Sequence, residues 1–224
     1  MQGIFDNLYE RSKNNTTKGL QLYEYIISKE NILLAYRNIK ANTGSRTAGT
    51  DSITIDQYKI ESAEMFVGDI RNILKNYKPQ TVRRVEIPKQ NGKKRPLGIP
   101  TMRDRLIQQM FKQVLEPICE AKFYNHSYGF RPNRSTHHAM ARCQYLINRT
   151  DYHHVVDIDI QGFFDNVNHN KLIKQMYSIG ITDKRVLTIV RKMLKAPIQG
   201  MGIPEKGTPQ GGLCKASHNP PYAK

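Results

Sequence analysis

Residues 155–165 form an apolar stretch that carries two acids at alternate positions, Asp157 and Asp159. Period-two alternation divides its side chains between the faces of a strand, with Val156, Ile158 and Ile160 on one face and Asp157 and Asp159 on the other. Aspartate is depleted from strands, and a buried carboxylate is unfavourable unless a cation pairs with it. The sequence therefore predicts a short buried strand whose acids meet either a metal ion or a Lys or Arg of this chain.

Composition points to a polyanionic partner. The 224 residues include 35 Lys or Arg and 19 Asp or Glu, which gives a formal net charge of +16 and favours nucleic acid. The three cysteines (Cys119, Cys143 and Cys214) are odd in number and widely spaced, which argues against a cysteine metal framework and fits a reduced cytosol. Because no apolar run is long enough to span a bilayer and no signal peptide is present, we expect a cytoplasmic protein without membrane contact.

Residues 81–100 predict a basic β-hairpin. Apolar and charged residues alternate before the Asn-Gly dipeptide at 91–92, which favours a tight turn between two strands. Seven Lys or Arg and a single Glu lie in residues 78–95. Lys89 and Arg95 lie on either side of the turn and are close enough to bind one anion together. The hairpin is thus either a solvated ribbon rimmed with charge or a mobile element that closes on a nucleoside triphosphate.

Helical periodicity is found in six segments, at residues 18–37, 60–77, 104–122, 137–148, 172–177 and 183–194. Glu116-Pro117 suggests a kink or an end in the third segment, and Ser135 is a candidate N-cap for the fourth. We expect the core side of that fourth helix to hold Ala139, Met140, Cys143, Leu146 and Ile147. Asp165 is a candidate cap for the turn or helix after the acidic strand.

Two further runs leave alternatives open. In the run 127–135, Arg131 could hold either a phosphate or an internal carboxylate. The run Lys-Gly-Thr-Pro-Gln-Gly-Gly at 206–212 is in isolation more typical of a surface turn, although its glycines would let backbone approach a substrate closely.

Taken in order, these motifs resemble those of the reverse transcriptases encoded by group II introns and of their bacterial relatives. The matching runs are Ile-Pro-Lys with Arg-Pro-Leu-Gly-Ile-Pro in the hairpin, Tyr-Gly-Phe-Arg-Pro at 128–132, the acidic strand, and Gly-Thr-Pro-Gln-Gly at 207–211. The resemblance covers nearly the whole chain and implies an α+β fold. That fold is the right-hand fold of reverse transcriptases. We expect this chain to contain its fingers and part of its palm, with a small antiparallel sheet and several helices.

The resemblance also implies roles for single residues. Asp159 would be the catalytic acid and, with the backbone carbonyl of Ile160, a ligand of two Mg²⁺ ions, with Mn²⁺ as an alternative. Phe163 would crowd the sugar 2′ position as a steric gate. The nucleotide would be bound by Lys89, Arg95, Phe163 and Gln210, and nucleic acid by Arg83, Arg84 and Arg131.

The chain departs from the family in two places. It contains no Asp-Asp pair, whereas the family's second acidic motif supplies such a pair to the metals. After Gly212 the family's apolar helix is replaced by residues 213–224, which include Pro220-Pro221 and are expected to be disordered. We expect four regions: an N-terminal extension with the start of the fingers (1–60), fingers (61–150), a partial palm (151–212) and the tail.

The expected function is that of an RNA-directed DNA polymerase of a mobile group II intron with a maturase role. Its partners would be the intron RNA, an RNA template with a DNA primer, and dNTPs, in a bacterial cytoplasm or an organellar nucleoid. We expect this chain to be a truncated portion that is inactive alone. The alternatives are a non-catalytic RNA-binding module, which the charge also fits, and a retron or diversity-generating reverse transcriptase.

Overall fold

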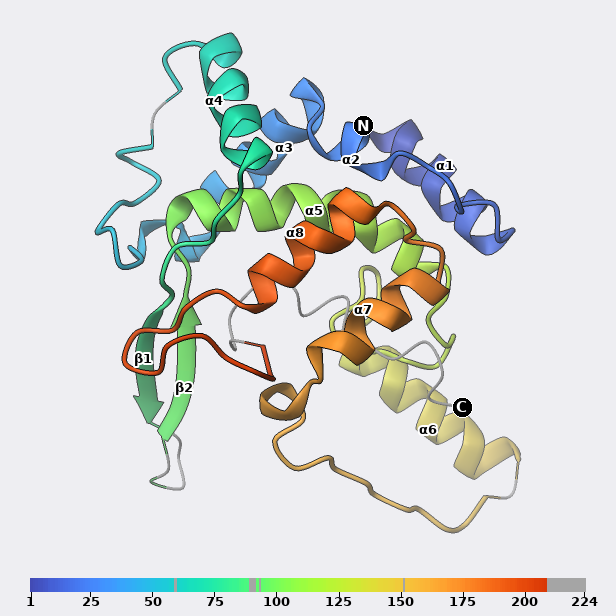
Figure 1. Ribbon diagram of the computed structural model, residues 1–224. Coiled ribbons are helices and arrows are strands. Elements are labelled where there is room, and N and C mark those ends of the chain that lie inside the picture. Colours follow the sequence, from blue (N-terminus) through green and yellow to red (C-terminus); the bar gives the residue numbers. More distant parts are fainter. Residues whose placement is uncertain (59, 89–91, 93, 151, 209–224) are drawn as a thin grey trace.

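A long helix, α5 (Met102–Glu120), runs through the centre of the molecule in the computed structural model (Figure 1). The structure describes residues 1–58, 60–88, 92, 94–150 and 152–208. Thr101 caps α5 by accepting a hydrogen bond from the Asp104 N–H at 3.4 Å. Eleven of its side chains are buried, because other helices cover it on more than one side. The expected helix at 104–122 is confirmed, and Pro117 lies in its final turn, three residues before its end.

Three N-terminal helices pack on α5 or beside it: α1 (Gln2–Lys13), α2 (Leu22–Ile26) and α3 (Lys29–Lys40). The single helix expected at 18–37 is wrong, because the chain breaks between α2 and α3. The reason is Ser28, whose extended backbone and side-chain oxygen begin a new helix by accepting from Asn31 N–H. Helix α1 was not expected from the sequence. A short 3-10 helix, η1 (Thr43–Arg46), follows α3.

Helix α4 (Ala63–Lys75) packs against α3, and the chain then enters the hairpin. Helices α7 (His169–Ser178) and α8 (Lys184–Leu194) pack on each other, and their apolar faces join the α5 core. All three helices confirm segments expected from the sequence. Across the described residues, no helix has the length and apolar character needed to cross a membrane.

The expected hairpin is confirmed as β1 (Arg83–Pro88) paired antiparallel with β2 (Lys94–Ile99). The register places Arg83 opposite Ile99 and Pro88 opposite Lys94. At its base, Val82 accepts a hydrogen bond from Gln199 N–H at 2.9 Å and donates one to the Pro197 carbonyl at 2.7 Å. The hairpin is therefore tied to the segment that follows α8. With helices around this small antiparallel sheet, the α+β class is also confirmed.

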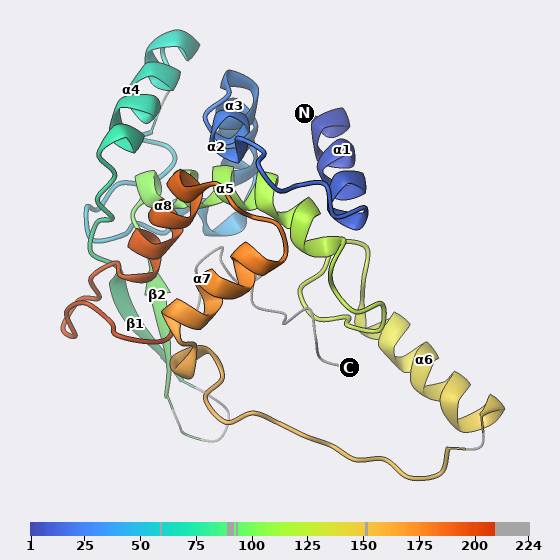
Figure 2. The ribbon, with the colours of Figure 1, turned by 45° about the vertical axis from the view of Figure 1, so that its right-hand side comes forward.

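The buried acidic strand is not found. Residues 152–160 run as an extended, exposed trace that links α6 (Thr136–Arg149) to the turn before α7 (Figure 2). The side chains of Val155, Val156, Ile158 and Ile160 are between 64% and 84% exposed. A strand is stabilised by pairing with a neighbour, and within the described part of the chain the hairpin is the only sheet, so this segment has no partner.

Helix α6 confirms the helical segment expected at 137–148, but the expectation that one side of it is buried in a core is wrong. Ser135 is its N-cap, as expected, and accepts from His138 N–H at 3.4 Å. None of its residues is buried, and Figure 2 shows the helix projecting from the body of the molecule. The apolar side expected to face a core therefore faces solvent, with Met140 and Ile147 among the exposed residues.

Candidate nucleotide and nucleic-acid site

A cavity of about 310 Å³ lies between the hairpin and the segment that follows α8. Its lining comes from both strands of the hairpin, from the turn before α7 and from residues 198–208, and comprises Arg84, Pro96, Leu97, Gly98, Asp165, Ile198, Met201, Pro204, Lys206, Gly207 and Thr208. Arg84 and Lys206 give it two cations, and Asp165 gives it one carboxylate. The lining therefore combines residues of the hairpin, of the end of the acidic stretch and of the beginning of the Gly-Thr-Pro-Gln-Gly motif.

Backbone hydrogen bonds lock the Gly-Thr segment onto the turn before α7. Gly207 N–H donates to the Val167 carbonyl and Thr208 N–H donates to the Phe164 carbonyl, both at 2.8 Å. The buried His169 places Nε2 2.7 Å from the Gly207 carbonyl, so the proton on Nε2 is donated to that oxygen. Two motifs that are about 40 residues apart are therefore held in one fixed arrangement.

Gly207 is required by geometry at this position. Its φ is +84°, a left-handed conformation that L side chains rarely adopt. An added Cβ would lie 2.8 Å from the Asp165 carbonyl oxygen and 3.1 Å from the Phe164 carbonyl oxygen. Only glycine lets the two backbone segments approach this closely, so the described start of the motif, at Gly207, is packed against the turn before α7.

Asp159 and Phe163 precede this arrangement in the chain. Asp159 is exposed on the extended segment, and Ile160 is 64% exposed beside it. Gly162, at φ +60°, turns the chain into the 3-10 helix η2 (Phe164–Asn166). Phe163 packs edge to face on Phe164, with ring centroids 5.4 Å apart, which fixes its direction at the start of the turn.

Asp165 does not cap a helix, contrary to expectation. It lies within η2, and α7 is capped instead by Asn168, which accepts from Lys171 N–H at 3.0 Å. Asp165 instead lines the cavity. The Lys206 ammonium donates to Asn166 Oδ1 at 2.8 Å and so is held at the same wall. Both residues lie within runs identified from the sequence, but their position at a cavity was not expected.

The carboxylates of the described residues do not fit a complete two-metal site. Among those residues, no group of three His, Cys, Asp or Glu side chains lies close enough to hold an ion. Asp159 and Asp157 stand on an exposed segment, and hard cations such as Mg²⁺ need several oxygen ligands at once. The chemistry of Asp159 suits one such ligand.

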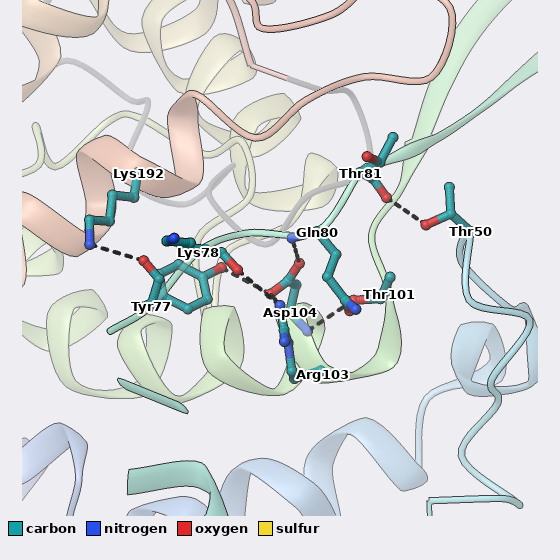
Figure 3. A network of polar contacts seen from close by, with 9 residues as sticks. All are labelled: Thr50, Tyr77, Lys78, Gln80, Thr81, Thr101, Arg103, Asp104 and Lys192. Atoms are coloured by element: carbon teal, nitrogen blue, oxygen red, sulfur yellow. Dashed lines mark hydrogen bonds and ion pairs between the residues drawn. The ribbon is translucent and has the colours of Figure 1, made fainter. Parts of the chain in front are cut away.

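A polar network holds residues 77–81, which lead into β1 and which we call the root of the hairpin (Figure 3). The buried Asp104 carboxylate accepts from Gln80 N–H at 2.7 Å and from the Tyr77 hydroxyl at 3.1 Å. Arg103 donates to the Lys78 carbonyl at 2.9 Å. Burial raises the pKa of Asp104 above its ordinary value, and these donors and the nearby Arg103 only partly oppose that shift. The residues between α4 and β1 are thus fixed to the first turn of α5.

Two further contacts brace this root from other elements. The Thr50 hydroxyl donates to the Thr81 carbonyl at 2.8 Å, and Lys192 of α8 donates to the Tyr77 carbonyl at 2.9 Å (Figure 3). The sequence analysis did not identify this network. An aspartate three residues after a Thr cap looks like an ordinary helix start, and only the fold brings residues 77–81 to it.

The other expected binding residues separate into three groups. Lys89 and Gln210 lie outside the described residues, and of Arg95 only the backbone is described, paired opposite Ile87. Arg83 begins β1, and Arg84 lines the cavity with its guanidinium against Met201 Sδ and 3.9 Å from Glu86. These positions place one basic strand of the hairpin at the cavity wall.

Arg131 has an internal role. Its guanidinium is buried and bonds the Glu120 carboxylate at 2.6 and 3.0 Å. It also donates to the carbonyls of Tyr124 and Ser127 at 2.6 and 2.9 Å. Of the two interpretations that the sequence leaves open, this geometry matches the internal carboxylate, and the expected contact with nucleic acid is not supported.

Comparison with known proteins identifies the family of this chain. Residues 87–216 match the family model described as reverse transcriptase (RNA-dependent DNA polymerase). The protein YkfC of Escherichia coli is 35% identical over 86% of this chain and 52% of its own length. The group II intron-encoded protein LtrA of Lactococcus lactis is 35% identical over 94% of this chain and 35% of its own. A 91 kDa protein in the cob intron of Schizosaccharomyces pombe is 34% identical over 93% of this chain and 26% of its own.

The fold has a solved counterpart as well. A chain of a Cas6-RT-Cas1–Cas2 complex superposes with a TM-score of 0.54, at 23% identity, over 89% of this chain and 21% of that one. The chain spans about half the length of YkfC and about a third of LtrA. The family model covers more than half of the chain, and intron-encoded relatives match nearly all of it, so this chain belongs to the reverse transcriptase family, with homologues among group II intron-encoded proteins.

Proposed function

We propose that the whole protein is an RNA-directed DNA polymerase of a mobile group II intron, and that the cavity beneath the hairpin receives the incoming nucleotide. The observation that carries this proposal is the locking of Gly207 and Thr208 onto the turn after Asp159, opposite Arg84 of the hairpin. This arrangement brings the end of the acidic segment, at Asp165, together with the Gly-Thr motif and the basic hairpin. The 310 Å³ volume and the cations Arg84 and Lys206 suit a phosphorylated ligand.

The residues have separate parts in this proposal. The hairpin cations, with Lys89 and Arg95, neutralise the triphosphate, and Gln210 lies beside the base. Phe163 borders the sugar. Asp159 and the Ile160 carbonyl are two ligands of a divalent cation, which we propose is Mg²⁺ with Mn²⁺ as a substitute. When bound, that cation supplies charge neutralisation at the phosphates.

We further propose the partners and the division of the chain. The partners are intron RNA, an RNA template with a DNA primer, and dNTPs, in a bacterial cytoplasm or an organellar nucleoid. The chain divides into an N-terminal extension (1–60), fingers (61–150), partial palm (151–212) and tail (213–224). The net charge of +16 supports a large polyanionic partner.

Primer extension with dNTPs and Mg²⁺ on an RNA template tests the catalytic proposal in the whole protein. Asp159→Ala is expected to abolish extension while leaving the affinity for RNA unchanged, since an exposed carboxylate contributes nothing to the basic surface. Asp6→Ala in α1 removes one carboxylate from a different element and serves as the matched control. Undiminished extension by Asp159→Ala would overturn the catalytic assignment.

A second candidate is a non-catalytic RNA-binding module. It is favoured by the absence, among the described residues, of a three-ligand metal cluster. The two candidates differ in their response to EDTA, because a binding module keeps its full function in the chelator. For this chain alone we expect salt-dependent RNA binding without extension.

A further inference from the structure

Helix α8 directs a cationic face to solvent. Its apolar side is buried against the core through Val186, Ile189, Val190, Met193 and Leu194. The opposite side carries Lys184, Arg185, Thr188 and Arg191, all exposed, and Lys195 follows the helix. The helix itself contains no acid, and among the described residues its N-cap Asp183 pairs with Arg185 alone, at 3.7 Å.

The helix also borders a hollow of about 430 Å³. Side chains of α2, α4 and α8 line it: Tyr23, Leu74, Lys75, Lys184, Arg185, Thr188, Ile189 and Lys192. Four of these eight side chains are cationic and none is acidic. The hollow shares no lining residue with the cavity beneath the hairpin, and it is therefore a separate feature.

The cations around the hollow are largely uncompensated. Arg185 is the exception, because it pairs with Glu24 at 2.7 Å and with Asp183 at 3.7 Å, and it stacks over the Tyr23 ring at 4.5 Å. Within the described parts of the chain, by contrast, the three lysines make no ion pair. Lys75 donates to the neutral Asn72 at 3.0 Å and Lys192 to the Tyr77 carbonyl at 2.9 Å.

We propose that this hollow binds the phosphate backbone of an RNA segment that lies outside the cavity beneath the hairpin. The inference rests on the proposed function, because it assumes that the chain binds RNA. Three uncompensated ammonium groups and the Thr188 hydroxyl around a concave surface suit phosphate oxygens, which position a strand without reading its sequence. Lys192 also connects the hollow to the root of the hairpin through Tyr77, so both RNA contacts are held by one framework.

A flat anionic membrane is a poorer fit to the same charges. The apolar lining residues Leu74 and Ile189 are buried, so the surface offers no apolar side chain for insertion between lipids. A flexible strand, unlike a bilayer, can place single phosphates inside a hollow. The proposal therefore commits to RNA, and lipid binding becomes an outcome of its test.

The test compares two charge-matched double variants of this chain. Lys75→Gln/Lys184→Gln removes two cations of the hollow, neither of which pairs with an acid. Lys171→Gln/Lys174→Gln removes two exposed cations of α7. Binding to a fluorescent single-stranded RNA is measured by anisotropy between 50 and 300 mM salt, with RNA-dependent protection from hydrogen exchange as a second readout. Circular dichroism confirms that each variant is folded.

The hollow variant is expected to lose about tenfold in affinity near 150 mM salt. Its salt slope should fall by about 1.4, since each lost phosphate contact removes about 0.7 from the slope for single strands. RNA should protect residues 184–192 from exchange in the unmodified chain but not in this variant. Equal losses of RNA affinity in the two double variants would overturn the inference. It would also be overturned if the hollow variant lost binding to phosphatidylserine vesicles but kept its affinity for RNA. Failure of the unmodified chain to bind RNA would instead refute the RNA-binding proposal itself.

Discussion

The backbone N–H of Gln80 donates a 2.7 Å hydrogen bond to the carboxylate of Asp104, and this contact fixes the point from which the basic hairpin extends. Asp104 is buried at the start of the central helix, whereas Gln80 lies between α4 and β1. The hairpin therefore takes its position from the core rather than from its own two strands. A two-stranded ribbon has little stability alone, so this anchor determines where its arginines lie.

Asp104→Asn is expected to destabilise the fold by about 1–3 kcal/mol, because the amide of Asn cannot accept from both Gln80 N–H and the Tyr77 hydroxyl. The free energy of unfolding from urea denaturation measures this cost. Asp69→Asn, an exposed change of the same kind on α4, is the control and should be close to neutral. Hydrogen exchange should also become faster in residues 80–88 of the Asp104 variant. Equal stability of the two variants would show that Asp104 is not an anchor.

The raised pKa of Asp104 predicts a pH dependence with a definite sign. In the unfolded chain an Asp titrates near pH 4, whereas burial raises the pKa of Asp104 in the folded protein. Between the two values the folded state holds more protons, so the contribution of Asp104 to stability falls as pH rises through this window. The stability advantage of the unmodified chain over Asp104→Asn should be largest below pH 4 and smaller at pH 7. Urea titrations at several pH values measure it, and an advantage that grows with pH would contradict the assignment.

Arg131→Met is expected to cost about 3–5 kcal/mol, because it leaves the Glu120 carboxylate without the partner that holds it at 2.6 Å. The double variant Arg131→Met/Glu120→Gln should recover part of this loss, since no charge is then stranded. Arg134→Met, at a neighbouring exposed position, should have little effect. If Arg131 contacted nucleic acid instead, its replacement would lower RNA affinity while leaving the unfolding free energy unchanged.

The sequence was sufficient to predict elements whose stability is local or whose apolar face meets the core. The hairpin, α4, α5, α7 and α8 carry clear periodicity together with caps or turn residues, and each was found. The acidic strand was misjudged because a strand depends on a neighbour, and alternation at 155–160 cannot show whether one is present. The same holds for the apolar side of α6, which was recognised correctly as a pattern although none of the residues of this helix is buried.

The candidate site was predictable only as a set of motifs. The order of the motifs along the chain indicated that the hairpin, Asp159 and the Gly-Thr run belong to one site. It did not indicate which residues contact one another there. The hydrogen bonds of Gly207 and Thr208 to residues 164–167, and the contacts of Asp104 with residues 77–80, join segments that are 24 to about 40 residues apart. Such contacts depend on the path of the chain, which no local spacing encodes. For this reason the position of Asp165 and Lys206 at a cavity was not expected.

Gly207→Ala tests whether the close approach of two backbone segments maintains the cavity. Alanine must adopt φ +84° and also place its Cβ 2.8 Å from the Asp165 carbonyl oxygen. Gly200→Ala is the matched control, because φ there is +78° but no atom lies within 4 Å of the added Cβ. Gly200→Ala should lower the free energy of unfolding by about 1 kcal/mol, for the conformation alone. Gly207→Ala should lower it by about 1–3 kcal/mol more, because of the close contact. Urea denaturation gives both values, and hydrogen exchange should become faster at Thr208 only in the Gly207 variant. If the two substitutions cost the same, the Gly207 loop has room to move away, and the cavity wall is not fixed by this contact.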